Sequence, residues 1–373
     1  MSFEKLQAIL QIEFDLFFAL RYTKLMQIKS ISLKNFRNHK DLSLSFRPGI
    51  NFLCGANAIG KTNVVEAIYY FATTKSFRTS KDFLCITEGE QQSTATLSLN
   101  RSFGNVELQM QIDKLQKKNF YKNGEKMTSP SKILGNFCAV LFSPDEMKIA
   151  KGGPEDRRNF IDLAISKLSG SYYDLLLRFE KILFSRNLLL KRGASDAEID
   201  VYDEQFALIA SKILKQRQTF IEKLKPFSQE NMSFLSKRKD SLNIKYDCPF
   251  SSGNLYNEIL EALGANRLRD REVGYTTLGP HRDDLVLSVS GKDIRHFGSQ
   301  GQQRTAVLAL KLAEYDVLKE TLGESPVLLL DDVFSELDST RSKLLLERAQ
   351  GEQTIITGTR ARTAPFAYNK IKL

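Results

Sequence analysis

The chain has 373 residues, of which 42% are apolar and 26% charged, and its formal net charge at pH 7 is +10. This composition is that of a globular protein with a substantial core, and the length favours two domains or one large domain with an insertion. No run of 18 apolar residues occurs, so the sequence predicts no transmembrane helix and no membrane partner. The positive charge favours a polyanionic partner.

The four cysteines are far apart and form no C-x-x-C pair. This spacing is typical of reduced cysteines in the core of a cytoplasmic protein. Only three histidines are present, which argues against a transition-metal site. Residues 1–25 lack the basic start and cleavage site of a signal peptide. We therefore expect them to be an N-terminal extension outside the functional fold, with a mis-assigned start as one explanation.

The first predicted elements are strands. Alternating polar and apolar residues indicate strands over 26–33 and 41–46, joined by a turn at 35–39. A nucleotide base would lie beyond its phosphates, near the edge of such strands. Arg37 and Asn38 in the turn are therefore candidates for contact with adenine or ribose, and a solvated turn is the alternative.

A phosphate-binding loop (P-loop) with the pattern G-x-x-x-x-G-K-T follows a buried strand at 50–54 and begins a helix at 62–71. Its backbone N–H groups would face the phosphates, helped by the positive end of the helix. Lys61 would reach the β- and γ-phosphates, and the hydroxyl of Thr62 would bind Mg²⁺. The residues predicted to bind the nucleotide are Gly55, Ala56, Asn57, Ala58, Ile59, Gly60, Lys61 and Thr62.

A lysine-rich hairpin follows two more predicted strands at 93–99 and 105–112. Asn123 and Gly124 form a dipeptide that favours a hairpin turn. With its surrounding lysines, this hairpin is a candidate for contact with phosphates. The alternative is a solvated hairpin whose charges prevent aggregation through the sheet edge. The lysines are Lys114, Lys117, Lys118, Lys122 and Lys126.

After a short buried strand at 137–142, the chain becomes helical. The periodicity over 155–240 predicts about three helices, including a long one across 200–225. The heptad pattern is not sustained, so we expect a compact lobe and not an extended coiled coil. Residues 254–263 indicate a further short helix, and strand alternation returns over 285–289.

Two carboxylates near the C-terminus complete the predicted site. Four apolar residues at 327–330 lead directly into Asp331 and Asp332. At the end of a buried parallel strand, Asp331 would lie where the Mg²⁺ beside a P-loop needs a carboxylate. Asp332 would orient or deprotonate the attacking water. Upstream, Ser299 and Gly301 begin a helix and would form a second anion-binding surface.

The order of these features is that of ABC-type ATPases, with a P-loop, a helical insert, a Ser-x-Gly-Gln helix and a carboxylate strand. The chain resembles the RecF family, whose members are related to the heads of SMC proteins. The resemblance begins at Met26 and rests on four stretches, 33–38, 144–162, 279–284 and 329–338. Residues 1–25 have no counterpart, and Gln300 stands where ABC-type ATPases in general have glycine.

The resemblance implies an α/β fold. An ABC-type ATPase head, made of a P-loop α/β core with an antiparallel β subdomain, would carry a helical lobe. The expected parts are the extension at 1–25, an N-terminal ATPase lobe at 26–154, a helical lobe at 155–265 and a C-terminal ATPase lobe at 266–373. The P-loop would belong to the N-terminal lobe, and the signature and carboxylates to the C-terminal lobe.

In ABC-type ATPases two heads enclose two ATP molecules, so the resemblance implies an ATP-dependent homodimer. Ser299, Gly301 and Gln302 would act in trans on the ATP and Mg²⁺ held by the other copy. The implied catalytic residues are Lys61, Asp332 and, in trans, Ser299.

Three further assignments rest on the resemblance alone. Asp338 would contact the nucleotide at the dimer interface, Thr357 would sense the γ-phosphate, and residues 144–146 would lie in the Q-loop region. RecF proteins bind double-stranded DNA, prefer duplex beside single-stranded gaps, and act with RecR and RecO in loading recombinase. The resemblance thus implies a slow, DNA-stimulated ATPase that works as a switch in DNA repair, DNA replication and the SOS response.

Other functions would require other features. A different SMC-like ATPase would carry a nuclease domain or long coiled coils, and neither is visible in the sequence. A transporter ATPase subunit would use the helices of 155–240 to dock on a membrane partner, and it would co-fractionate with membranes. A small-molecule kinase would need neither the Ser299 signature nor the loop at 335–338.

Overall fold

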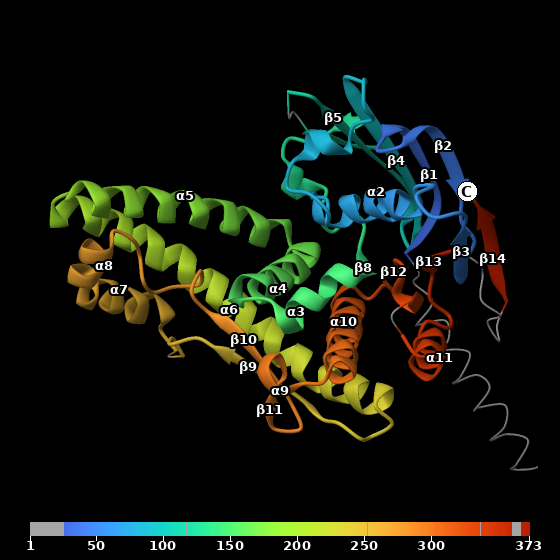
Figure 1. The fold of residues 1–373 in the computed structure, drawn as a ribbon. Coiled ribbons are helices and arrows are strands. Elements are labelled where there is room, and N and C mark those ends of the chain that lie inside the picture. Colours follow the sequence, from blue (N-terminus) through green and yellow to red (C-terminus); the bar gives the residue numbers. More distant parts are fainter. Residues whose placement is uncertain (1–25, 116–117, 252, 336, 360–366) are drawn as a thin grey trace, which may run out of the picture.

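The computed structural model describes residues 26–115, 118–251, 253–335, 337–359 and 367–373. The predicted extension at 1–25 lies outside these residues. The described chain forms a head of two sheets and their helices, from which a helical arm projects (Figure 1). No helix within the described ranges combines the length and apolar character that a bilayer crossing requires.

The first sheet is antiparallel and has six strands in the order β2-β1-β4-β5-β6-β7. Ile31, Leu97 and Leu108 face one another directly across three neighbouring strands, and all three are fully buried. One face of the sheet therefore packs on the core, which is why the sequence alternates. The strands are β1 (Gln27–Phe36), β2 (His39–Ser45), β4 (Gln92–Arg101), β5 (Gly104–Asp113), β6 (Lys118–Lys122) and β7 (Glu125–Lys126).

The second sheet is parallel and has five strands in the order β14-β3-β13-β12-β8. Parallel sheets are covered on both faces, and β3, β8 and β12 are accordingly buried along their whole length. The strands are β3 (Ile50–Cys54), β8 (Ala139–Phe142), β12 (Val327–Leu330), β13 (Thr354–Gly358) and β14 (Tyr368–Lys372).

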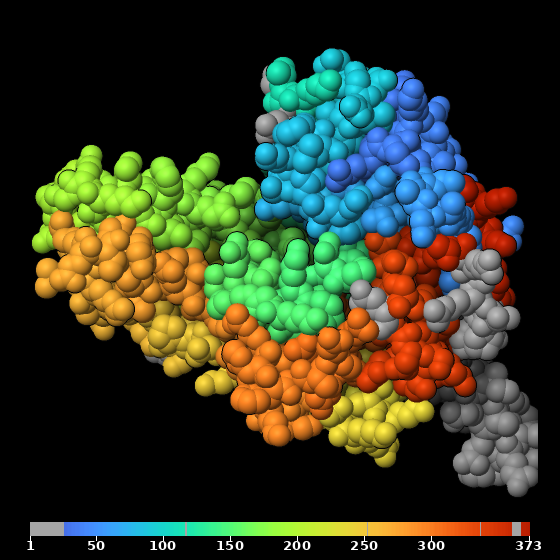
Figure 2. Space-filling model, in the orientation of Figure 1, coloured from blue at the N-terminus to red at the C-terminus, as the bar shows by residue number. Residues whose placement is uncertain are grey.

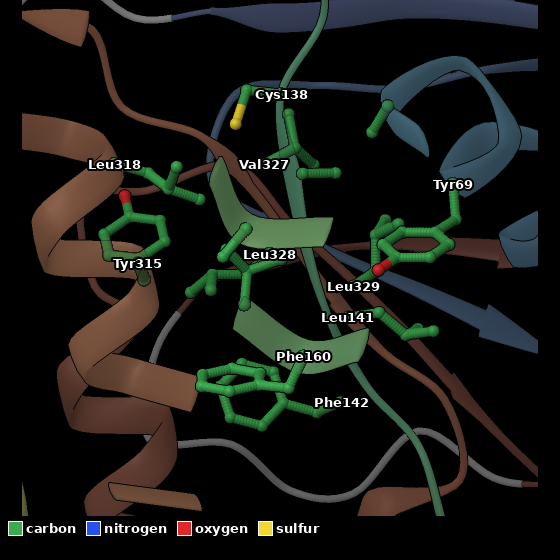
Figure 3. Close-up of a cluster of buried hydrophobic side chains, with 14 of the residues drawn as sticks. Tyr69, Cys138, Leu141, Phe142, Phe160, Tyr315, Leu318, Val327, Leu328 and Leu329 are labelled. Carbon is green, nitrogen blue, oxygen red and sulfur yellow. The ribbon is translucent and has the colours of Figure 1, made fainter. Parts of the chain in front are cut away.

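Helices α2 (Lys61–Thr73) and α10 (Gln300–Leu322) contribute core side chains around this parallel sheet. Tyr69 of α2 and Leu318 of α10 lie among the buried residues of β12, such as Leu328 (Figure 3). The parallel strands all end at the same edge. The P-loop after β3, the carboxylates after β12 and the hydroxyl of Thr357 on β13 are therefore brought together.

The helical arm consists mainly of α5 (Gly170–Arg192) and α6 (Asp196–Leu235), with α4 (Pro154–Leu168) at its base (Figure 1). Helix α6 begins at a capping box between Ser195 and Glu198 and runs for 40 residues. It is thus longer than the predicted 200–225. Pro226 lies inside the helix, where its missing N–H is costly, and packing of α6 along α10 offsets this cost.

The remaining elements are short. A three-stranded antiparallel sheet in the order β11-β10-β9 links the arm to α10. It consists of β9 (Leu242–Asp247), β10 (Asp284–Val289) and β11 (Lys292–Asp293). The other helices are α3 (Lys148–Lys151), α7 (Leu255–Ala265), α8 (Arg267–Val273), α9 (Ile294–Phe297) and α11 (Ser339–Arg348), with 3₁₀ turns η1 (Asp82–Cys85), η2 (Pro130–Lys132), η3 (Pro144–Met147) and η4 (Val333–Ser335).

Candidate functional site

The P-loop connects β3 to α2 and is braced by the turn between β1 and β2. Asn38 Nδ2 donates hydrogen bonds to the carbonyls of Ile59 at 3.0 Å and Ala58 at 3.4 Å. Gly60 has a φ of 107°, and a Cβ at this position would lie 2.4 Å from both Asn38 Oδ1 and His39 Nε2. Only glycine fits this backbone, so the second glycine of the pattern is required by the brace as well as by the loop.

Lys61 arches back over the loop that precedes it. Its Nζ donates to the carbonyl oxygens of Gly55 at 2.9 Å and Ala56 at 2.7 Å. The ammonium group is thereby held against the loop that precedes α2. A cation and a helix N-terminus together attract the phosphates of a nucleotide.

We expect Lys61→Ala to weaken ATP binding by at least about 10-fold, because hydrogen bonds from a charged group contribute about 1.5–3 kcal/mol each. Equilibrium binding of a fluorescent ATP analogue measures the change. Lys81→Ala removes an exposed lysine from the loop before η1 and serves as the control. Retention of wild-type affinity by Lys61→Ala would refute the role of this lysine.

Two hydroxyls and one carboxylate form the candidate Mg²⁺ position. Thr62 Oγ1 donates to Asp331 Oδ1 at 3.0 Å, and Thr357 Oγ1 donates to the same oxygen at 2.8 Å. Burial raises the pKa of Asp331, while the hydrogen bonds from Thr357 and Thr62 oppose this rise. Within the described ranges, no three His, Cys, Asp or Glu side chains gather in a way that could hold a metal ion. The oxygens of Thr62 and Asp331 suit Mg²⁺, which binds through few carboxylates together with phosphates and water.

Asp332 lies beside this position in an unusual backbone conformation. Its φ is 52°, in the left-handed region, and its backbone N–H donates to Thr357 Oγ1 at 3.0 Å. Thr357 Oγ1 therefore accepts a hydrogen bond from the backbone of Asp332 and donates one to the carboxylate of Asp331. Asp332 is exposed and lines a cavity of about 480 Å³ together with Lys61, Thr62 and Thr357.

Arg37 is held by α2. Its guanidinium donates to the carboxylate of the buried Glu66 at 2.9 Å and 2.5 Å, and to the carbonyl of Leu84 at 2.7 Å. These bonds fix the turn on the helix, and contact of Arg37 with adenine or ribose stays a prediction. Arg78 is a residue that sequence reasoning missed. It lines the P-loop cavity, and its Nη1 donates to Asn63 Oδ1 at 2.7 Å.

The signature residues lie at the start of α10. Ser299 and Gln302 form a capping box, in which Ser299 Oγ accepts from the N–H of Gln302 at 3.2 Å and Gln302 Oε1 accepts from the N–H of Ser299 at 3.1 Å. Asp338 caps α11 by accepting from the N–H of Arg341 at 2.8 Å. A Cβ at Gly301 would lie 3.7 Å from Nη2 of Arg341, so the two helix starts are neighbours.

The structure thus separates the predicted site residues into two groups. The P-loop, Asp331, Asp332 and Thr357 gather at the edge of the parallel sheet. Within the described ranges, the lining of the P-loop cavity includes none of residues 299–302 and not Asp338.

In the lysine-rich hairpin, Lys118 Nζ donates hydrogen bonds to the carboxylate of Asp82 at 2.8 Å and to the carbonyl of Thr74 at 2.7 Å. Lys118 therefore anchors the hairpin onto η1 and the end of α2. Lys117 lies outside the described residues. Contact of this hairpin with phosphates stays a prediction.

Comparisons with known proteins agree with this geometry. The family model described as RecF/RecN/SMC N terminal domain matches residues 27–372. The DNA replication and repair protein RecF of Clostridium novyi is 41% identical over 90% of this chain and 93% of its own length. The protein of the same name from Clostridium kluyveri is 39% identical over 90% of this chain and 93% of its own length.

Solved structures give the same result. The recombination mediator protein RecF with bound ATPrS has a TM-score of 0.87 and 35% identity, covering 94% of this chain and 97% of that one. The corresponding complex with ATP has a TM-score of 0.85 and 34% identity, covering 91% and 94%. An Smc head domain derived from Pyrococcus furiosus is similar in fold alone, with a TM-score of 0.53 and 19% identity over 90% of each chain.

These matches confirm the expected ABC-type ATPase head with its antiparallel β subdomain and helical lobe. Two of these solved RecF structures are complexes with ATPrS and with ATP. From its sequence, its fold and the P-loop site, the chain belongs to the RecF family of DNA replication and repair proteins.

Proposed function

We propose that this protein is an ATP-driven switch on DNA, in which two copies close around two ATP molecules and slow, DNA-stimulated hydrolysis reopens them. The observation that carries the proposal is the division of the site. Lys61, Thr62 and Asp332 line one cavity, whereas Ser299 is exposed at the start of α10 and takes no part in the described lining. Each chain thus carries two half-sites, which a second copy would complete.

Within one copy, the P-loop binds the phosphates and Lys61 neutralises part of their charge. Mg²⁺, held by Thr62 and Asp331, would stabilise the negative charge that develops on the phosphate oxygens. Asp332 takes up a proton from, or orients, the attacking water. Thr357 contacts both aspartates and so transmits a change at the γ-phosphate to each of them.

The second copy contributes its signature. The oxygen of Ser299 already accepts a hydrogen bond from Gln302, which leaves its own O–H free to donate to a phosphate oxygen. Gly301 lets that phosphate approach the start of α10 closely, and Asp338 fixes the neighbouring helix start. ATP thereby supplies contacts that only the closed dimer satisfies, so its binding shifts the population towards closure and its hydrolysis reverses the shift.

Double-stranded DNA beside a single-stranded gap is the proposed substrate surface. The net charge of +10 supports contact with the phosphate backbone without base readout. The solved relatives are described as mediators in the RecFOR pathway, and we extend that role to this chain, with RecR and RecO as partners in loading recombinase. All four cysteines are free, which supports the cytoplasm as the compartment.

Ser299→Arg tests the proposal. We expect this variant to bind ATP like the wild type and to remain monomeric with ATP, because a bulky cation would occupy the place of the trans-acting hydroxyl. Sedimentation with and without ATP and gapped DNA measures the oligomeric state.

Ser195→Arg is a matched control, because Ser195 forms the same kind of capping box at the start of α6, on the arm. Each substitution removes one helix cap, which lowers the free energy of unfolding by about 1 kcal/mol. Normal ATP-dependent dimerisation by Ser299→Arg would contradict the model of a site completed by a second copy.

A further inference from the structure

A short basic loop lies between α6 and β9, next to the signature. Lys237, Arg238 and Lys239 are consecutive and exposed, and none of them has an ion-pair partner among the residues that the structure describes. In Figures 1 and 2, the yellow C-terminal end of α6 lies at the lower edge of the molecule, beside the orange segment that begins α10. The three cations thus belong to a loop that contacts the signature, because Asp240 of this loop is hydrogen-bonded to Gln302.

The backbone of this loop is held in a strained shape. Lys237 and Arg238 have φ values of 54° and 62°, in the left-handed region that long side chains rarely adopt. The N–H of Arg238 donates to the carbonyl of Ser233 at 2.7 Å, and the N–H of Asp240 donates to Ser236 Oγ at 3.1 Å. Glycine or asparagine at positions 237 and 238 would relieve this strain. The chain instead has two cations there, although the left-handed backbone disfavours long side chains.

Asp240 connects the loop to the signature. Its Oδ1 accepts a hydrogen bond from Gln302 Nε2 at 2.9 Å. The other end of the same amide, Gln302 Oε1, accepts from the N–H of Ser299 at 3.1 Å. Two hydrogen bonds through the Gln302 amide therefore link the loop to Ser299, the residue that would meet the nucleotide of a second copy.

We propose that Lys237, Arg238 and Lys239 bind the phosphates of the nucleotide held by the second copy, and that Asp240 positions the signature through Gln302. The inference rests on the proposed function, in which Ser299 approaches those phosphates. Lysine and arginine close to a helix C-terminus also interact favourably with the helix dipole. That role alone would alter the stability of α6 and leave dimerisation unchanged.

The test is the triple variant Lys237→Gln, Arg238→Gln, Lys239→Gln, studied by sedimentation with ATP and without DNA. We expect the dissociation constant of the ATP-bound dimer to rise at least about 10-fold, with ATP affinity of the monomer unchanged, because three charged contacts are lost. The matched control replaces three exposed lysines earlier on α6, Lys212, Lys215 and Lys223, by glutamine and removes the same charge. The control is expected to dimerise like the wild type.

A wild-type protein that fails to dimerise with ATP would refute the proposed function itself. If the wild type dimerises and the triple variant does so equally well, the phosphate assignment is wrong. Normal dimerisation with a selective loss of DNA affinity would overturn it too, because the three cations would then belong to a DNA surface. Should the triple variant unfold, Lys239→Gln gives the same test, since Lys239 lies outside the left-handed pair.

The positioning role of Asp240 has a separate readout. Asp240→Ala loses the bond to Gln302 and is expected to weaken ATP-dependent dimerisation. Asp240→Asn keeps an oxygen that accepts from Gln302 Nε2, so it is expected to restore dimerisation to near the wild-type level. Equal behaviour of the alanine and asparagine variants would exclude this role.

Discussion

Asp332→Asn is expected to lower the rate of ATP hydrolysis by about 100-fold to 10,000-fold, the range over which general bases contribute. The carboxylate of Asp332 faces the P-loop cavity, and an amide cannot accept a proton from water there. The substitution preserves the local geometry. Asparagine tolerates the left-handed backbone at this position, and the N–H that donates to Thr357 is unchanged.

Single-turnover hydrolysis and sedimentation measure the two consequences. Hydrolysis is expected to slow while ATP still binds, so the closed dimer accumulates. Asp247→Asn, an exposed position at the end of β9, is the control for a charge change away from the site. A hydrolysis rate like that of the wild type would exclude Asp332 as the base.

The grouping of the P-loop with Asp331 and Asp332 could be predicted from the sequence because its signals are local. A P-loop is a continuous stretch, and the buried strand before it and the helix after it are read from adjacent residues. Asp331 and Asp332 follow an apolar run, and all such runs in a parallel sheet end at one edge. Strand direction therefore places Thr62 and Asp331, which are 269 residues apart, at the same edge of the sheet.

Contacts that depend on long-range packing could not be predicted in this way. The guanidinium of Arg37 is bound to Glu66 of α2, and a turn residue gives no sign of which helix passes beneath it. Arg78 reaches the cavity from a polar loop that has no periodicity. Helix α6 continues through Pro226 because α10 packs along it, although local propensity favours a break.

The edge strand β14 (Tyr368–Lys372) also lacked a local signal. It pairs in parallel with β3, and its side chains are exposed or half-buried. A short edge strand of this kind alternates too little to be distinguished from a polar tail. Its place in the sheet is set by β3, more than 300 residues earlier in the sequence.

A buried cluster of charges ties the signature helix to the rest of the head, and its disruption is the second large effect that we expect. Glu314 of α10 is paired with Lys167 of α4 at 2.7 Å and with Lys311 at 2.6 Å, and Lys311 also reaches Glu146 at 3.1 Å. Glu314, Lys167 and Lys311 are each no more than 3% exposed. Glu146 belongs to η3, directly after β8, so the cluster joins α4, α10 and the parallel sheet.

Glu314→Gln is expected to reduce the free energy of unfolding by about 3–5 kcal/mol, the usual cost of removing one partner from a buried ion pair. The substitution leaves two buried ammonium groups with Glu146 as their remaining carboxylate. Chemical denaturation at pH 7 measures the loss. Glu320→Gln on the exposed side of the same helix is the control, and its effect should stay within about 0.5 kcal/mol.

The pH dependence of stability shows whether the lost charge of Glu314 is what destabilises the variant. Burial by itself would raise the pKa of Glu314, but Lys167 and Lys311 outweigh burial and hold this pKa below its ordinary value. A carboxyl group with a lowered pKa stabilises the fold above its ordinary pKa, and this contribution is lost as the pH falls through the lowered value. The wild type should therefore lose more stability than Glu314→Gln as the pH falls from 7 towards about 2. If the difference in free energy of unfolding between the wild type and Glu314→Gln stays constant over this range, altered packing, and not the lost charge, destabilises the variant.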